Sequence, residues 1–171
     1  ADAEDWALVG RLDYEPILGL NIGGSFYLGD SGQGQVVDTS NREADVFTEI
    51  YEIHSQYKVR GLELKALASQ VKIDDAEAVG ADVPDEIFAY YGEVAYNVLP
   101  HLVQGTSHYL APFVRYENLD YDGNNEDVEL LVTGLSYKPI PNVVIKADYS
   151  NFDKKHGVRA DELNIGFGYI F

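Results

Sequence analysis

Acidic and basic side chains recur two residues apart along stretches of this sequence that alternate like β-strands. Because a strand repeats every two residues, such neighbours share one face. Rows of opposite charge across a pore set a transverse field that orients polar solutes and tunes selectivity. The alternative is that the charges only neutralise one another and hold the strand register. Four such pairs are present: Arg11 and Asp13, Glu63 and Lys65, Arg115 and Glu117, and Lys146 and Asp148.

The polar faces of these stretches predict the lining of a pore. Arg115 is the best single candidate, because a guanidinium is always charged and rigid. The full predicted set is Arg11, Asp13, Glu52, Lys58, Glu63, Lys65, Glu93, Arg115, Glu117, Lys146 and Asp148.

A denser acidic cluster surrounds the glycine of the Asp122-Gly-Asn turn. Its oxygen-bearing side chains suit Ca²⁺, a hard cation that takes six to eight oxygen ligands. The spacing departs from an EF-hand, and a solvated acidic loop is the alternative. Acidic loops would also meet lipopolysaccharide through bridging divalent ions. The predicted calcium ligands, and the only cofactor site we expect, are Asp120, Asp122, Asn124 and Glu126.

Catalytic chemistry has little support in the sequence. His54 precedes Ser55, but adjacent strand residues point to opposite faces and cannot pair directly. His101 and His108 fall near a predicted turn. No G-x-S-x-G motif or metal-ligand cluster accompanies them. We expect no enzyme and no catalytic residue.

The charged stretches belong to about nine strand-like segments in which apolar and polar residues alternate. Each is roughly 10–14 residues long, the length that a tilted strand needs to cross a bilayer. Aromatic residues cluster at the segment ends, as in interfacial girdles. These features favour an all-β, antiparallel transmembrane β-barrel over a soluble β-sandwich. The segments lie near 5–15, 17–28, 45–58, 61–73, 86–98, 108–119, 127–138, 142–152 and 161–171.

The last segment carries the clearest signal. Its alternate residues are all large and apolar, with asparagine and glycine between them, and the chain ends on an aromatic residue. A lipid-facing strand that targets a protein to the bacterial outer membrane has this pattern. The residues are Leu163, Ile165, Phe167, Tyr169 and Phe171.

Composition agrees with an envelope barrel. The chain has 171 residues, no cysteine and a net charge of -17, which argues against a nucleic-acid partner. No apolar run is long enough for a transmembrane helix. Sixteen of the 17 net negative charges fall in four segments outside the predicted strand centres: 1–5, 29–45, 74–86 and 120–127 carry -3, -3, -6 and -4.

Connection lengths alternate between short and long, with one of intermediate length near 100–107. Outer-membrane barrels have short periplasmic turns and longer extracellular loops, so the acidic connections are expected outside and the C-terminus in the periplasm. Nine strands would then begin outside at Ala1. We therefore expect residues 1–171 to form a single domain that is incomplete at its N-terminal side, from a barrel of roughly 16–18 strands. A complete barrel of about 8–10 strands is the alternative.

Several stretches resemble the C-terminal half of the phosphate-selective porin (O and P type) superfamily of proteobacteria. The resemblance implies a barrel, often trimeric, that passes small polar or charged solutes by diffusion. It also implies contact with outer-membrane lipid, lipopolysaccharide and the barrel-assembly machinery. The mixed charges of the predicted lining lack a basic ladder, so phosphate is not implied. A structural or sleeve-type barrel without an open channel is the alternative. The stretches are Gly10–Pro16, Leu18–Gly23, Gly92–Leu99, Ala111–Glu117, Gly134–Pro139, Pro141–Tyr149 and Leu163–Phe171.

Overall fold

The computed structural model describes residues 6–31, 46–80, 83–121, 127–154 and 160–170. It contains nine strands and two helical turns, α1 (Ala76–Val79) and α2 (Leu99–Leu102). The nine predicted strands are confirmed, with ends shifted by a few residues. The two helical turns lie inside predicted connections and were not expected. The strands are β1 (Ala7–Ile17), β2 (Leu20–Asp30), β3 (Phe47–Val59), β4 (Leu62–Ile73), β5 (Glu86–Tyr96), β6 (Tyr109–Tyr121), β7 (Val128–Lys138), β8 (Val143–Lys154) and β9 (Ala160–Tyr169).

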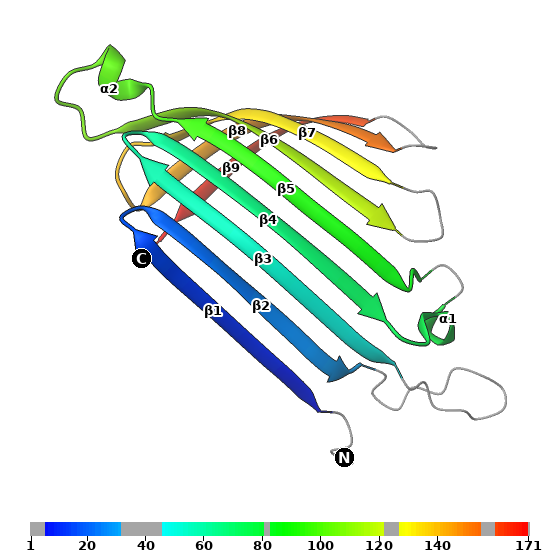
Figure 1. Ribbon diagram of the computed structural model, residues 1–171. Helices are drawn as coiled ribbons and strands as arrows, with labels where there is room; N and C mark the ends of the chain where they lie inside the picture. Colours follow the sequence, from blue (N-terminus) through cyan, green and yellow to red (C-terminus); the bar gives the residue numbers. More distant parts are fainter. Residues whose placement is uncertain (1–5, 32–45, 81–82, 122–126, 155–159, 171) are drawn as a thin grey trace.

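All nine strands form one antiparallel sheet in chain order, from β1 at one edge to β9 at the other. The sheet is strongly curled, so that β6 to β9 lie behind β1 to β5 in Figure 1. It is not closed: within the described ranges, no pairing joins β1 to β9. The all-β antiparallel prediction is confirmed. The described strands also do not form the small complete barrel that was considered as an alternative.

The two faces of the sheet differ in chemistry and in exposure. The buried strand residues, among them Ala95, Ala111 and Phe113, lie on the face that carries the charged side chains. This face is therefore the concave one. On the convex face, large apolar residues are exposed, such as Ile53 at 68% and Leu135 at 42%. A soluble sheet would cover that face with a second layer, and none packs against it in the part of the chain that is described.

Aromatic residues form two bands on the convex face. In β3, Tyr51 and Tyr57 are six residues apart, as are Tyr90 and Tyr96 in β5. Six residues of strand span about 20 Å. The band near the long connections contains Phe26, Tyr51, Phe88, Tyr90, Tyr116 and Tyr149, and the band near the short turns contains Tyr14, Tyr57, Tyr96, Tyr137 and Tyr169.

Two tight turns depend on glycine. Gly19, between β1 and β2, has φ +85°, and Arg60 and Gly61, between β3 and β4, have φ 48° and +87°. The predicted segments near 5–15 and 17–28 left Pro16 as the first turn, but β1 continues through it to Ile17 with a register shift after Tyr14. Proline is tolerated there because β1 is an edge strand and the pairing is already irregular. The turn forms two residues later, where glycine can adopt a positive φ.

Connection length does not alone decide the end of the sheet. The connection expected near 100–107 spans 97–108, which makes it as long as the α1 connection, 74–85, at the opposite end. The two-residue turns, the 139–142 turn and the α2 segment lie at one end, and the α1 connection lies at the other (Figure 1). The described helices are too short to span a membrane.

Candidate functional site

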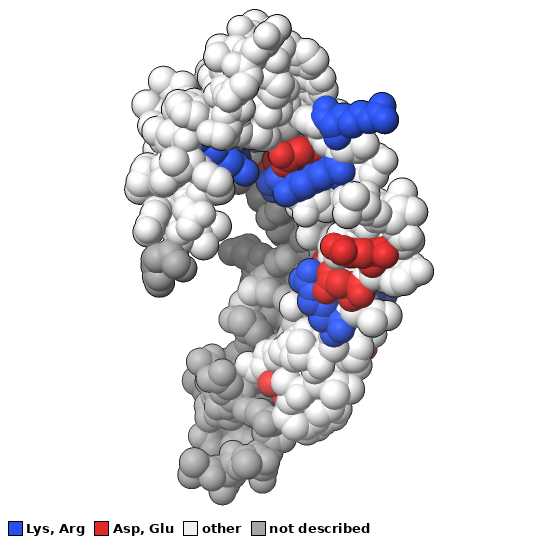
Figure 2. Space-filling model, turned by 90° about the vertical axis from the view of Figure 1, so that its left-hand side faces the viewer, with Lys and Arg blue, Asp and Glu red and all other residues white. Residues whose placement is uncertain are grey.

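The strand registers place all eleven predicted lining residues on the concave face. Glu52 of β3 shares this face with Ser25 of β2 and Ser69 of β4, and Glu93 of β5 shares it with Lys65 and Arg115. Figure 2 views the molecule from the end with the short turns, where the sheet wraps around an open hollow and basic and acidic groups lie side by side. Seven of the eleven residues fall into two connected clusters.

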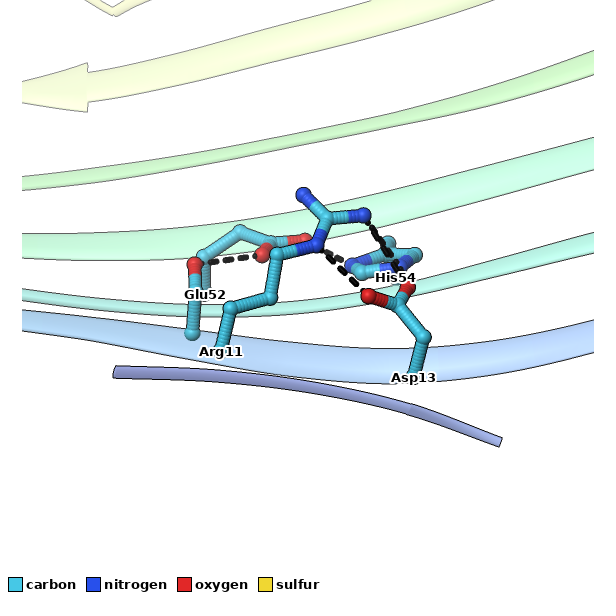
Figure 3. Close-up of polar contacts among 5 residues, drawn as sticks. Arg11, Asp13, Glu52 and His54 are labelled. Atoms are coloured by element: carbon cyan, nitrogen blue, oxygen red, sulfur yellow. Dashed lines mark hydrogen bonds and ion pairs between the residues drawn. The ribbon is translucent and has the colours of Figure 1, made fainter. Parts of the chain in front are cut away.

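The first cluster joins β1, β2 and β3 (Figure 3). Arg11 donates to Asp13 through Nε at 2.7 Å and through Nη2 at 3.0 Å. Asp13 Oδ1 also lies 2.8 Å from Nε2 of His54. On the other side of the ring, Nδ1 of His54 lies 2.7 Å from Oε1 of Glu52. Ser25 Oγ completes the row by donating to Glu52 Oε2 at 2.8 Å.

Gly23 allows this cluster to form. It lies on β2 between Asp13 and His54 in the pairing register. A Cβ at this position would come within 2.6 Å of the His54 ring and 2.7 Å of the carbonyl oxygen of Leu12. The imidazole therefore occupies space that any other residue would fill. Asp13 and His54 meet across β2 because Gly23 has no side chain.

The second cluster joins β4, β5 and β6. Lys65 Nζ donates to Glu93 at 2.7 Å, and Arg115 Nη1 lies 3.9 Å from the same carboxylate. Arg115 Nε lies 2.5 Å from Glu117, although its N–H does not point along that contact. We interpret this contact as an ion pair without an aligned hydrogen bond. The Arg115 guanidinium also stacks over the ring of Tyr91 at 3.9 Å, which holds it flat against the wall.

The four predicted pairs behave differently. Arg11 with Asp13 and Arg115 with Glu117 are in contact. Glu63 and Lys65 instead find partners on neighbouring strands: Lys58 lies 3.9 Å from Glu63, and Lys65 donates to Glu93. In an antiparallel sheet, residues opposite each other across strands approach more closely than residues two apart in one strand.

The remaining pair lies on β8. Lys146 Nζ lies over the ring of Phe113 at 4.5 Å, and Asp148 accepts a weak hydrogen bond from Asn164 at 3.4 Å. The two charged clusters lie on β1 to β6. Beside them, an apolar wall is formed on the concave face of β6, β7 and β8 by Phe113, Leu119, Val128, Leu130, Val132 and Phe152. The same face also carries polar residues, among them Ser136 and Ser150.

Three contributors were missed by sequence reasoning: Ser25, His54 and Tyr91. His54 follows Glu52 by two residues, so its place on the charged face was readable from the period of the strand. Its contact with Asp13 was not, because that contact depends on the register of three strands. Nothing in the sequence distinguished Tyr91 from the other aromatic residues of the alternating strands, so its contact with Arg115 was not predicted.

The predicted calcium site cannot be placed. Asp120 lies in β6, whereas Asp122, Asn124 and Glu126 lie outside the described residues, as does Phe171 of the terminal strand. Among the described residues, no three His, Cys, Asp or Glu side chains converge on a metal position.

The fold and its lining define an all-β protein with one curled meander sheet, apolar outside and charged inside. No protein-family model matches the chain. A protein of Aquifex aeolicus (strain VF5), described as an uncharacterized protein, is 24% identical to it over 193 residues. That alignment covers 100% of this chain and 42% of the relative, so the chain spans less than half of the relative's length.

Proposed function

We propose that the chain is part of an outer-membrane β-barrel through which small polar or charged solutes diffuse. One observation carries this proposal: the apolar side chains are on the exposed convex face, and the ion pairs are on the concave face. A water-soluble protein has the opposite arrangement. Contiguous exposed apolar surface of this extent marks contact with a membrane or another protein.

The convex face has the layers that a bilayer requires. Its two aromatic bands are about 20 Å apart along the strands, which for strands tilted by about 35–45° is about 15 Å along the membrane normal. Both bands then fall within or at the borders of the roughly 25 Å apolar band of outer-membrane barrels. Beyond the band near the long connections, the convex face becomes polar, and Tyr51 Oη donates to Glu49 at 3.3 Å. Tyrosine with its ring in hydrocarbon and its hydroxyl in a polar layer is typical of a membrane interface.

The open edges support closure by further strands. In a bilayer, each backbone N–H or C=O group of β1 and β9 that has no hydrogen-bond partner would destabilise the protein by several kcal/mol. A sheet that spans the membrane must therefore close. We infer a barrel of roughly 16–18 strands, the size range in which a water-filled channel remains. The resemblance to the phosphate-selective porins supports the same size, and the family assignment itself stays a hypothesis.

The proposal also implies an orientation of the chain in the outer membrane and a set of partners. The acidic long connections face outward toward lipopolysaccharide, and the short turns and the C-terminus face the periplasm. Outer-membrane lipid covers the convex face, the barrel-assembly machinery inserts the chain, and a homotrimer is the expected assembly. Calcium binding near Asp120 remains a prediction from the sequence.

Planar lipid bilayers test the function directly. The full-length protein, of which this chain would be one part, should insert from detergent and give discrete conductance steps that scale with salt concentration. If insertion is verified, by protease protection in vesicles, and no conductance follows, the channel is refuted.

A sleeve that encloses a partner is the second candidate. The apolar wall of β6 to β8 favours it. Apolar side chains of an enclosed polypeptide could pack against this wall, whereas a channel that holds only water and small solutes has no use for an apolar surface. In that case the inserted protein would not conduct, and the partner would co-purify in stoichiometric amount.

A further inference from the structure

His54 is held between two carboxylates, one at each ring nitrogen. Nε2 lies 2.8 Å from Asp13 and Nδ1 lies 2.7 Å from Glu52. A carboxylate only accepts hydrogen bonds, so both ring nitrogens must donate for both contacts to be favourable. Only the imidazolium donates from both nitrogens. The geometry therefore assigns a positive charge to His54 in this arrangement.

The nearby position of Arg11 does not change that assignment. Its Nη2 lies 3.2 Å from Nε2 of His54, but it also donates to Asp13 at 3.0 Å. Arginine only donates hydrogen bonds, so a hydrogen bond from Arg11 Nη2 to Nε2 would require that Nε2 carries no proton. An unprotonated Nε2 would then face the Asp13 carboxylate, and two acceptors would be in contact. If Arg11 and the His54 imidazolium both donate to Asp13, no two acceptors face each other.

The charges of the cluster then cancel. β1 contributes Arg11 and Asp13, and β3 contributes His54 and Glu52. β2 contributes Gly23 and the uncharged Ser25, and β4 places Leu67 opposite His54. With the imidazolium present, two positive and two negative groups balance. Without its proton, the same wall carries one net negative charge.

We propose that His54 is the residue that sets ion preference at this level of the channel, through the charge on its ring. This inference rests on the proposed function and deepens it. The protonated cluster is neutral and does not favour either ion sign. Loss of the proton leaves an uncompensated carboxylate on the wall, which favours cations. Arg11, with a side chain 60% exposed, and Asp13, at 36%, border the hollow, so solutes pass close to the cluster.

Reversal potentials in planar bilayers test the proposal. The cation-to-anion permeability ratio should rise by about two- to threefold as the pH increases from about 5 to about 9, the effect of one added charge near the ion path in a watery pore. His54→Gln removes the positive charge permanently, so this variant should show the high-pH ratio already at about pH 5. His54→Lys keeps the charge and should hold the low-pH ratio throughout.

His101→Gln is the matched control. His101 lies at the end with the short turns, with its ring stacked on Tyr96, and removing it should leave the wild-type pH response intact. Equal ratios for wild type and His54→Gln at about pH 5 would overturn the proposal.

A second measurement does not depend on conductance. In selectively labelled protein in detergent, ¹⁵N chemical shifts should show both His54 nitrogens protonated while the carboxylates of Asp13 and Glu52 are ionised. A single protonated nitrogen would overturn the inference even if the channel conducts. A doubly protonated ring in a protein that never conducts would instead count against the proposed function alone.

Discussion

At the scale of single residues, the absence of a side chain matters as much as the presence of charge. Gly23 provides the space in which the His54 ring lies, and the carboxylates of Asp13 and Glu52 then fix that ring from both sides. The cluster therefore depends on the missing side chain of Gly23 and on five polar residues: Arg11, Asp13, Ser25, Glu52 and His54.

Gly23→Ala is expected to break this arrangement. The added methyl would lie 2.6 Å from the imidazole, so His54 must leave its position between the carboxylates. We expect a loss of about 1–3 kcal/mol in the free energy of unfolding, as for other overpacked sites. Gly92→Ala is the control, because a Cβ there meets nothing within 4 Å. Urea titration of both variants in detergent measures the difference, and equal losses would contradict the account.

Glu93 is the least exposed charge of the second cluster, with a side chain 8% exposed. Glu93→Gln leaves Lys65 and Arg115 without the carboxylate that they share. We expect a loss of about 1–3 kcal/mol in unfolding free energy and a shift of the permeability ratio toward anions. Glu63→Gln should cost no more than about 1 kcal/mol. Its ion-pair partner Lys58 is 52% exposed and 3.9 Å away, and a glutamine oxygen can still accept the hydrogen bond from Tyr109. A larger loss for Glu63→Gln would be inconsistent with this ranking.

At the scale of strands and turns, the positive φ angles identify where the chain tolerates least change. Gly19 and Gly61 each occupy the second position of a two-residue turn with nearly equal φ, so an alanine costs about 1–2 kcal/mol of backbone strain at either position. Only at Gly19 does the new Cβ also collide with backbone, 2.2 Å from the carbonyl oxygen of Lys58. Gly19→Ala should therefore lower the unfolding midpoint further than Gly61→Ala, and the reverse order would refute the turn assignment.

The terminal strand tests which face meets lipid. On β9, Ile165 is 79% exposed on the convex face, and the adjacent Asn164 lies on the concave face beside Asp148. A lysine on the lipid face of a barrel costs about 2–4 kcal/mol near the midplane. Ile165→Lys should lower the yield of folded, heat-resistant protein in vesicles, whereas Asn164→Lys should not. Equal tolerance would argue against a membrane on the convex face.

The strands and their faces were predictable because a period of two repeats over nine segments. The turn at Gly19 was not, since proline at position 16 gave the stronger local signal and a register shift carried β1 past it. Nor were the partners of Lys65 and His54, because they depend on pairing between strands. Closure into a barrel stays beyond the described sheet and is a proposal here.

At the scale of the whole molecule, charge is distributed unevenly between the two ends. The connection that follows β4 begins with Asp74 and Asp75 and contains Glu77, while the opposite end presents Arg60 in a tight turn. In the proposed orientation the first end faces outward.

Proteases with different specificities test that orientation in cells that express the protein. A glutamate-specific protease added to intact cells should cut at Glu77, and trypsin should reach the exposed Arg60 only after the outer membrane is opened. Cleavage at Arg60 in intact cells would reverse the orientation.

The strict chain order of the sheet also bears on how it assembles. Every strand pairs with its neighbour in the sequence, so each step of folding closes a short loop, and the entropy of closing a loop grows only slowly with its length. The β1–β2 and β3–β4 hairpins have two-residue turns. Their closure costs the least entropy, so we expect these hairpins to form first. Assembly would then proceed by addition of hairpins rather than of single strands. Relatives of different length are expected to gain or lose strands in twos, with the registers of the remaining strands unchanged.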